Sequence, residues 1–373
     1  MTLDDDGTII EIGQLTHETP STEFYNGIIV PGFVNSHCHI ELSHLQDKFE
    51  RNSGMAGFIR QINRLREVAD KEARLKSIQY QMEQLYSSGV SAMADISNCN
   101  ESFEAKSKSK LYTRTFLEVF GTEEKDVPKI EEGVISLTQE AQSYGIDAAP
   151  TPHSCYTMSK KLLQHITKIA LDYNWLSYHN QESWEEEQLL INGTGPLADE
   201  YNNRGLSTPP VTGESALLYF LDIVKSVGIS DSAKVLLVHN TFTNKESIQK
   251  AKDIIKELYW AICPLSNIFI HQALPPLQLM RREGLNITIG TDSLSSNHTL
   301  SIVEEIKTIQ NFFPDIPLIE ILEWSCYNGA KFLNKEDILG SFEVGKKPGV
   351  VLIDNIDFSN LKLTDLSRST RLI

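Results

Sequence analysis

The chain has 373 residues, of which 40% are hydrophobic, and this is ample for a sizeable buried core. It contains 34 Lys and Arg against 50 Asp and Glu, which gives a formal net charge of −16. So acidic a surface repels phosphate groups, and therefore disfavours nucleic acid and anionic membrane surfaces as partners. No segment approaches the roughly 20 apolar residues of a membrane span. Five scattered cysteines without a CxxC pair favour a reducing, cytoplasmic compartment.

Eight short β-prone segments follow one another along the chain, and helical patterns separate most of them. Apolar strands that alternate with amphipathic helices are typical of an α/β fold with a parallel sheet. Eight such units over about 270 residues predict a (β/α)8 TIM barrel, whereas an open doubly wound sheet usually has a glycine-rich phosphate loop, which is absent here. The predicted strands are 28–37, 89–97, 111–120, 145–153, 175–182, 234–240, 259–266 and 285–293. The predicted helices are 56–87 (one or two), 129–143, 159–172, 213–227, 244–257, 275–283 and 299–312.

The two ends of the chain depart from this alternation. Residues 4–13 indicate a short hairpin strand, and residues 340–355 indicate two turns followed by an apolar strand. We therefore predict a small β-sandwich built from residues 1–30 and 335–373, beside a barrel of residues 31–334. Plain terminal extensions are the alternative.

Histidines and an aspartate stand at the carboxyl ends of the first, fourth, fifth, sixth and eighth predicted strands. In a barrel of parallel strands these ends converge on one face, and the active site forms there. Scattered polar residues would not all stand at strand ends, so the pattern predicts one site. The residues concerned are His37, His39, His153, His179, His239 and Asp292.

His37 and His39 are separated by one residue, so on a strand both point into the barrel and can bind one metal ion. Cys38 between them points toward the helices, and we interpret it as a packing residue. Together with His179 and Asp292, the two histidines form a set of three nitrogens and one oxygen. Such a set leaves a position open for water, which is typical of a catalytic metal site.

Glu182 follows His179 by three residues, where its carboxylate can move protons between water and a leaving group. His239 ends an apolar strand, and we interpret it as polarising the water or the tetrahedral centre, with a buried core histidine as the alternative. Asp292 can also accept a proton from the water. The other histidines are His17, His165 and His271, interpreted as structural or exposed, and His44 and His298, which lie in loops that could face the pocket.

Several motifs, in order, resemble the amidohydrolase superfamily, in its cytosine deaminase and chlorohydrolase-like branch. They are "PGFVNSHCHIELS", "PTPHSCYTMS", "HNQES", "LVHN", "CPLSN", "IGTDSLSSN" and "GSFEVGKKPGVVLID". The resemblance implies a mononuclear hydrolase with one divalent metal, zinc before iron, that usually deaminates amino-substituted heterocycles. By position it implies metal binding by His37, His39, His179 and Asp292, proton transfer by Glu182 and Asp292, assistance by His239, and substrate contact by His153.

Within that branch, "HIELS" with "GTDSLSSN" is most similar to aminodeoxyfutalosine deaminases. This implies a purine-like or nucleoside-like substrate, with Glu41 on a ring nitrogen and Ser293 as a further contact. "HNQE" departs from the branch's H-x-A-E, which leaves the substrate open. The alternatives are a chlorohydrolase or amidase at the same metal, a non-catalytic metal-binding barrel, and a solute-binding module. We expect a small-molecule partner, with a homodimer as one option for assembly.

Overall fold

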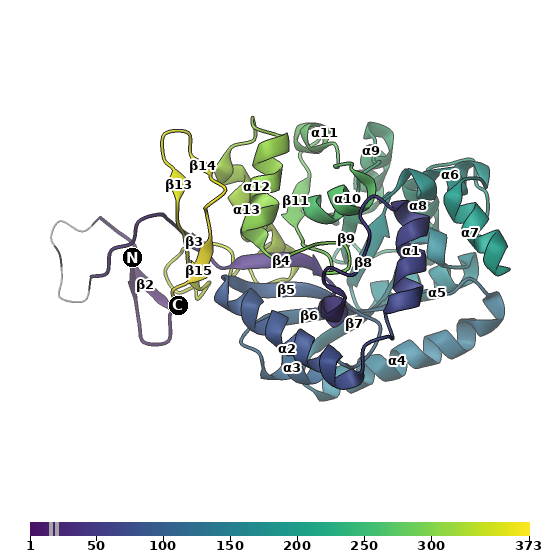
Figure 1. Cartoon of the computed structure of the whole chain (residues 1–373), viewed down its shortest axis with the longest axis horizontal. Coiled ribbons are helices and arrows are strands. Elements are labelled where there is room, and N and C mark those ends of the chain that lie inside the picture. Colours follow the sequence, from purple (N-terminus) through teal and green to yellow (C-terminus); the bar gives the residue numbers. More distant parts are fainter. Residues whose placement is uncertain (15–17, 19–21) are drawn as a thin grey trace.

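A computed structural model of the chain describes residues 1–14, 18 and 22–373. Eight parallel strands form a barrel with helices around it (Figure 1). The (β/α)8 fold that the sequence predicts is therefore confirmed. In chain order the barrel strands are β4 (Phe33–Cys38), β5 (Val90–Ser97), β6 (Tyr112–Val119), β7 (Asp147–Pro152), β8 (Trp175–Asn180), β9 (Lys234–His239), β10 (Glu257–Ile262) and β11 (Asn286–Ile289).

The barrel consists of two four-stranded arcs, in the orders β4-β5-β6-β7 and β11-β10-β9-β8, which meet at two seams. At one seam a parallel bridge joins Cys38 to Asp292, and the backbone N–H of Asp292 donates to the carbonyl of His37 at 3.0 Å. At the other seam the backbone N–H of His179 donates to the carbonyl of His153 at 2.9 Å. Because both seams are closed, the fold is not an open doubly wound sheet.

Helices cover the outside of the barrel. Those that the sequence periodicity predicts are α1 (Gly54–Leu65), α2 (Lys71–Ser87), α4 (Val127–Ser143), α5 (Lys160–Asp172), α8 (Ala216–Val227), α9 (Lys245–Ile254), α11 (Leu277–Arg282) and α12 (Ile302–Phe312). Six others are too short to show a clear period: α3 (Phe103–Lys108), α6 (Trp184–Asn192), α7 (Pro196–Arg204), α10 (Pro264–His271), α13 (Leu318–Ser325) and α14 (Tyr327–Phe332). Within the described residues, none of the helices is long and apolar enough to cross a membrane.

The predicted first strand, 28–37, is two strands in the structure. β3 (Ile28–Pro31) pairs with strands from the other end of the chain, and β4 belongs to the barrel. The break falls at Gly32, where a Cβ would lie 1.9 Å from Oγ of Ser91 and 2.6 Å from the carbonyl oxygen of Pro348. Glycine is therefore the residue that lets the backbone pass between the two sheets.

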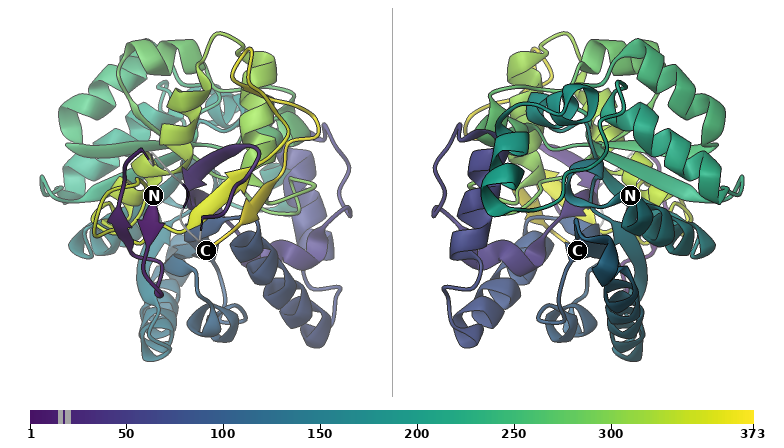
Figure 2. Two further views of the ribbon diagram at one scale, coloured as in Figure 1. Left: turned by 90° about the vertical axis from the view of Figure 1, so that its left-hand side faces the viewer. Right: turned by 90° about the vertical axis from the view of Figure 1, so that its right-hand side faces the viewer.

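Strands from both ends of the chain form small sheets beside the barrel. β3 pairs with β12 (Val350–Ile353), which pairs with β15 (Ser369–Arg371), while β1 (Thr2–Leu3) with β2 (Ile9–Glu11) and β13 (Ile356–Asp357) with β14 (Lys362–Leu363) form hairpin pairs. Both termini lie among these strands, at the end of the barrel where β4 begins (Figures 1 and 2). The domain boundaries at 30 and 334 stay a prediction, and His17 lies outside the described residues.

A buried ion pair supports the backbone that follows β4. Lys106 of α3 donates to Asp95 of β5, and both side chains are fully buried. The other carboxylate oxygen of Asp95 accepts the backbone N–H of Ile40 at 2.9 Å. Asp95 therefore holds in place the residue directly after His39.

Replacing Lys106 with methionine would leave the charge of Asp95 buried without its partner. We expect K106M to lower the free energy of unfolding by roughly 3 kcal/mol, because an uncompensated buried charge is costly. Urea unfolding of the purified variant measures this loss. The control is K108M, which removes the exposed partner of Glu104 on the same helix and should cost far less. Equal losses in the two variants would contradict the structural role of Lys106.

Candidate active site

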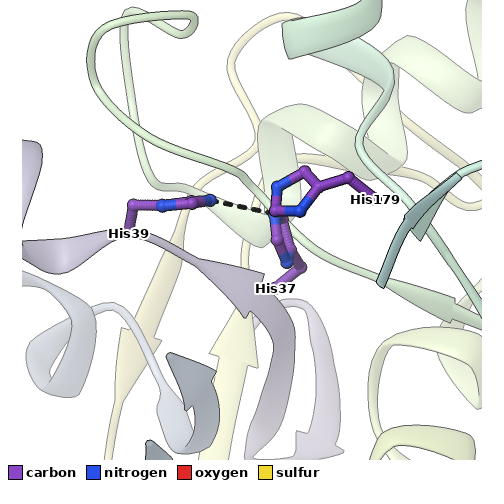
Figure 3. A group of neighbouring side chains, drawn as sticks. All are labelled: His37, His39 and His179. Carbon is purple, nitrogen blue, oxygen red and sulfur yellow. Dashed lines mark hydrogen bonds between the residues drawn. The ribbon is translucent and has the colours of Figure 1, made fainter. Parts of the chain in front are cut away.

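Three imidazoles converge at the carboxyl-terminal rim of the barrel (Figure 3). His37 belongs to β4, His39 follows it directly, and His179 belongs to β8. One ring nitrogen of each lies within 4.8 Å of the others, and all three residues are buried. Nε2 of His37 and Nε2 of His39 are only 3.2 Å apart. The structure therefore gathers three ring nitrogens that could bind a metal ion, from parts of the chain that are distant in the sequence.

The alternation of side chains along β4 is interrupted. Val34 packs in the cluster inside the barrel, whereas Cys38 packs in the outer cluster with Met55 and other helix side chains. In a regular strand, residues four apart share a face. The pairing of β4 with β5 shifts register between Asn35 and Cys38, so an irregularity at this point accounts for the change of face. Cys38 points toward the helices, as the sequence predicts.

Asp292, just after β11, completes the group. Its Oδ1 lies 3.9 Å from Nε2 of His37 and 3.6 Å from Nε2 of His39. Its Oδ2 accepts hydrogen bonds from the hydroxyls of Ser266 at 2.6 Å and Ser296 at 2.7 Å. Burial opposes ionisation, but the facing imidazoles still hold the pKa of Asp292 well below its usual range. The serines therefore fix an ionised carboxylate with Oδ1 directed at the histidines.

The spacing of these atoms fits a divalent cation. Nε2 of His37, Nε2 of His39 and Oδ1 of Asp292 form a triangle with sides of 3.2, 3.6 and 3.9 Å. The point equidistant from its corners lies about 2.1 Å from each, which is the usual length of a zinc–nitrogen or zinc–oxygen bond. Burial lowers the pKa of His37 and His179 well below the ordinary value, so both rings are neutral and can offer a lone pair.

Glu118, at the end of β6, is a site residue that the sequence analysis missed. Its Oε1 lies 3.3 Å from Nδ1 of His179, and its Oε2 accepts the side-chain amide of Asn98 at 3.2 Å. A carboxylate beside Nδ1 favours the tautomer that carries the proton there and leaves the lone pair on Nε2, an arrangement common behind metal-binding histidines. The signal was present in the sequence, because Glu118 is also a polar residue near the end of an apolar strand.

We expect Glu118→Gln to weaken metal binding by roughly 10–100-fold, because an amide does not hold the imidazole of His179 as a carboxylate does. Competition with a chelator of known affinity measures the metal dissociation constant. Glu246→Gln, at an exposed position on α9, is the matched control. An unchanged dissociation constant in the Glu118 variant would show that Glu118 does not support the metal site.

A cavity of about 680 Å³ opens over the histidines, and this volume suits a small organic ligand. The predicted site residues on its wall are His39, His153, His179, Glu182, His239, Asp292 and Ser293. Much of the remaining wall is apolar, with the side chains of Leu42, Met55, Phe58, Ile59, Ile62, Phe120, Tyr156, Tyr201 and Leu206. Arg66 and Arg204 also line it. The cavity therefore offers a polar floor and largely apolar walls.

Glu182 lies between two imidazoles at the edge of this floor. Its Oε1 is 3.7 Å from Nε2 of His239 and 4.0 Å from Nε2 of His271. Burial, together with the nearby charge of Asp292, raises the pKa of Glu182 well above its usual range. Burial lowers the pKa of His239 to about 4. A carboxyl group that readily holds a proton thus faces a neutral imidazole, a pairing suited to proton transfer.

The backbone at the site is locally strained. His239 and Asp292 have φ values of 70° and 57°, in the left-handed region that residues with a side chain rarely adopt. Such conformations persist where the surrounding structure enforces them, and they cluster at functional sites.

His153 and Ser293 both face the cavity. The ring of His153 stacks on that of His179 with centroids 4.3 Å apart, and its Nδ1 hydrogen-bonds the hydroxyls of Ser154 and Thr157. Its Nε2 is therefore the nitrogen left for a ligand. The hydroxyl of Ser293 lies 2.5 Å from that of Ser295. Their contacts with a substrate stay predictions.

Glu41 is held by protein groups in the structure, and its contact with a substrate ring stays a prediction. Arg66 donates to its Oε1 at 2.5 Å, and the backbone N–H groups of Asn98 and Cys99 donate to its Oε2 at 2.9 and 3.3 Å. These three partners line the cavity, whereas Glu41 is not among the described residues on its wall. Glu41 therefore holds Arg66, a residue of the cavity wall, in place.

The remaining described histidines differ in how close they lie to the candidate site. His44 hydrogen-bonds the carbonyl of Arg66 at 2.9 Å, and His298 is exposed beside a different cavity, so neither lines the cavity over the metal-binding group. His165 is partly exposed on α5. His271 is buried beside Glu182, and its place so close to the site was not foreseen in the sequence.

Comparisons with known proteins agree with the barrel fold. A model of the amidohydrolase family matches residues 28–371. An adenosine deaminase of Helicobacter pylori is 26% identical over 358 residues, which cover 92% of this chain and 84% of that protein. An aminodeoxyfutalosine deaminase of Nitratiruptor sp. is 25% identical over 337 residues, which cover 88% of this chain and 79% of that protein. The crystal structure of H. pylori aminofutalosine deaminase with methylthio-coformycin matches with a TM-score of 0.82 at 23% identity, over 100% of this chain and 94% of that one.

Proposed function

Since this chain belongs to the amidohydrolase family, we propose that it is a metal-dependent hydrolytic deaminase that releases ammonia from an amino-substituted purine or nucleoside. The observation that carries the proposal is the convergence of His37, His39 and Asp292 around a point at metal–ligand distance. Glu182 and His239 lie on the same cavity. Relatives named as deaminases of adenosine, 5'-deoxyadenosine and aminodeoxyfutalosine support the substrate class.

In the proposed reaction, a divalent cation held by His37, His39, His179 and Asp292 would lower the pKa of a water to about 7 and so supply the nucleophile. Glu182 takes up the first proton that the attacking water loses and passes it to the ring nitrogen. The second proton of that water, accepted by Glu182 or Asp292, then reaches the departing amine, which leaves as ammonia. Its raised pKa suits it to this role, because the protonated carboxyl persists toward neutral pH.

His239 stabilises the charge that develops during attack. The amide of Asn267 donates toward Nδ1 of His239 at 3.4 Å, which places the ring proton on Nε2. That N–H lies 3.7 Å from Oε1 of Glu182 and has no hydrogen-bond partner among the described residues. A neutral donor fixed in a buried site is well suited to stabilise a developing oxyanion.

The proposed resident metal is zinc, with iron as the alternative. Imidazole and carboxylate ligands suit both metals, and three nitrogens with one oxygen leave a coordination position for the nucleophile. Elemental analysis of the purified protein should find about one metal ion per chain, and its identity decides between them.

A screen for ammonia release tests the activity itself. The substrates are adenosine, 5'-deoxyadenosine, S-adenosylhomocysteine, aminodeoxyfutalosine, guanine and cytosine, with a chloro-heterocycle as the competing class. Ammonia from a purine nucleoside is the expected result. Chloride release alone would favour a chlorohydrolase, and a metal-loaded protein that is inactive on every substrate would favour a non-catalytic barrel.

The expected compartment is the cytoplasm. All five cysteines are free thiols, and four of them are buried, which suits a reducing environment. Assembly as a homodimer is the accompanying proposal, and light scattering at several protein concentrations tests it.

A further inference from the structure

His271 is a buried imidazole that the reaction described above does not use. It is the last residue of α10, and its side chain is 1% exposed. Neither Nδ1 nor Nε2 has a hydrogen-bond partner within the described part of the chain. Buried polar groups without partners are rare and need an explanation. A leucine would fill the same space without two unmatched nitrogens, so packing alone does not explain the histidine.

The surroundings of His271 point to the catalytic acid. Its Nε2 lies 4.0 Å from Oε1 of Glu182, and Glu182 lies 3.7 Å from Nε2 of His239. Asn267 and His271 are four residues apart on α10, so they share one face of that helix. Asn267 contacts His239 at 3.4 Å. One face of α10 thus lies beside both Glu182 and His239.

We infer that His271 is a positioning residue that holds the carboxyl group of Glu182 from the side away from the cavity and orients it toward the substrate. This inference rests on the proposed acid–base role of Glu182. His271 is not among the described residues that line the cavity, so it acts through Glu182 and not on the substrate. A movement of about 1 Å closes the 4.0 Å gap to hydrogen-bond distance, which a turn of the carboxyl group can supply.

The protonation state of His271 agrees with a donor role. Burial, together with the neighbouring His239, lowers its pKa to about 3, so the ring is neutral at physiological pH. A neutral ring carries one N–H, and Nε2 is the nitrogen that faces Glu182. It can therefore orient the carboxyl without adding a charge that would keep Glu182 ionised.

Two substitutions separate positioning from packing. H271L keeps a similar volume and removes the donor, whereas H271Q keeps an N–H near the position of Nε2. The substrate that the wild-type protein deaminates is used for steady-state kinetics, and elemental analysis gives the metal content. We expect H271L to lower kcat by about tenfold or more, while KM and metal content stay near the wild-type values. H271Q should recover most of the lost kcat. His165→Leu, on the surface of α5, is the control.

The alternatives give different results. A normal kcat in H271L, or equal losses of kcat in H271L and H271Q, would overturn the positioning role. If H271L does not fold, H271N replaces it, because the shorter amide reaches the position of Nδ1 but not that of Nε2 and should not rescue kcat. A wild-type protein that releases no ammonia from any substrate refutes the proposed function instead, and is seen before any variant is made.

Discussion

Glu182→Gln lowers kcat by roughly 10²–10⁴-fold and leaves the metal content unchanged, if the carboxyl group moves protons in the reaction. Glutamine has nearly the same shape, but it cannot take up and release a proton. Glu182 is not one of the four proposed metal ligands. Its Oε1 lies 3.7 Å from Nε2 of His239. Steady-state ammonia release and elemental analysis of the same preparation measure both quantities.

Glu185→Gln is the matched control for this variant. Glu185 is three residues further along the chain and is also buried, but its carboxylate accepts the backbone N–H groups of Met55 and Ala56 at 3.0 and 2.9 Å. We expect its substitution to affect stability more than kcat. A Glu182 variant with near-normal kcat would remove Glu182 from the mechanism, and with it the basis for the role of His271.

The outline of the site could be predicted from the sequence because it depends on a one-dimensional rule. Parallel strands in a barrel end on the same rim, so residues that end apolar strands must meet there. His37, His179, His239 and Asp292 follow this rule, and the structure brings them together. The rule also applies to Glu118, which was overlooked because only the histidine and aspartate endings were considered.

The contacts made by loops and short helices could not be predicted in this way. Glu41 and Arg66 are 25 residues apart and meet only because α1 folds back over the cavity. α10 has eight residues, which is too short for a periodic pattern to show which side chains face the site. The position of His271 beside Glu182 is therefore a result of tertiary packing. The register shift between Asn35 and Cys38 likewise cannot be recognised from the order of polar and apolar residues in the sequence of β4.

The site predicts a second large effect, the loss of metal from His179→Ala. Of the four proposed ligands, His179 and Asp292 come from the arc of the barrel opposite to His37 and His39, so without His179 only Asp292 holds the ion from that side. We expect the purified variant to contain little metal and to lose nearly all activity. Its melting temperature should also stop responding to added zinc, because a ligand stabilises only the folded state that binds it.

His153→Ala is the control that makes the His179 experiment decisive. The ring of His153 stacks on that of His179 at 4.3 Å and lines the same cavity, but its Nδ1 is taken by Ser154 and Thr157. Its removal opens a comparable space beside the site while the three imidazoles that fit the ion are kept. We therefore expect this variant to keep its metal and to show a higher KM. A fully loaded His179→Ala protein would reject His179 as a ligand, and loss of metal from both variants would attribute the effect to packing around the site.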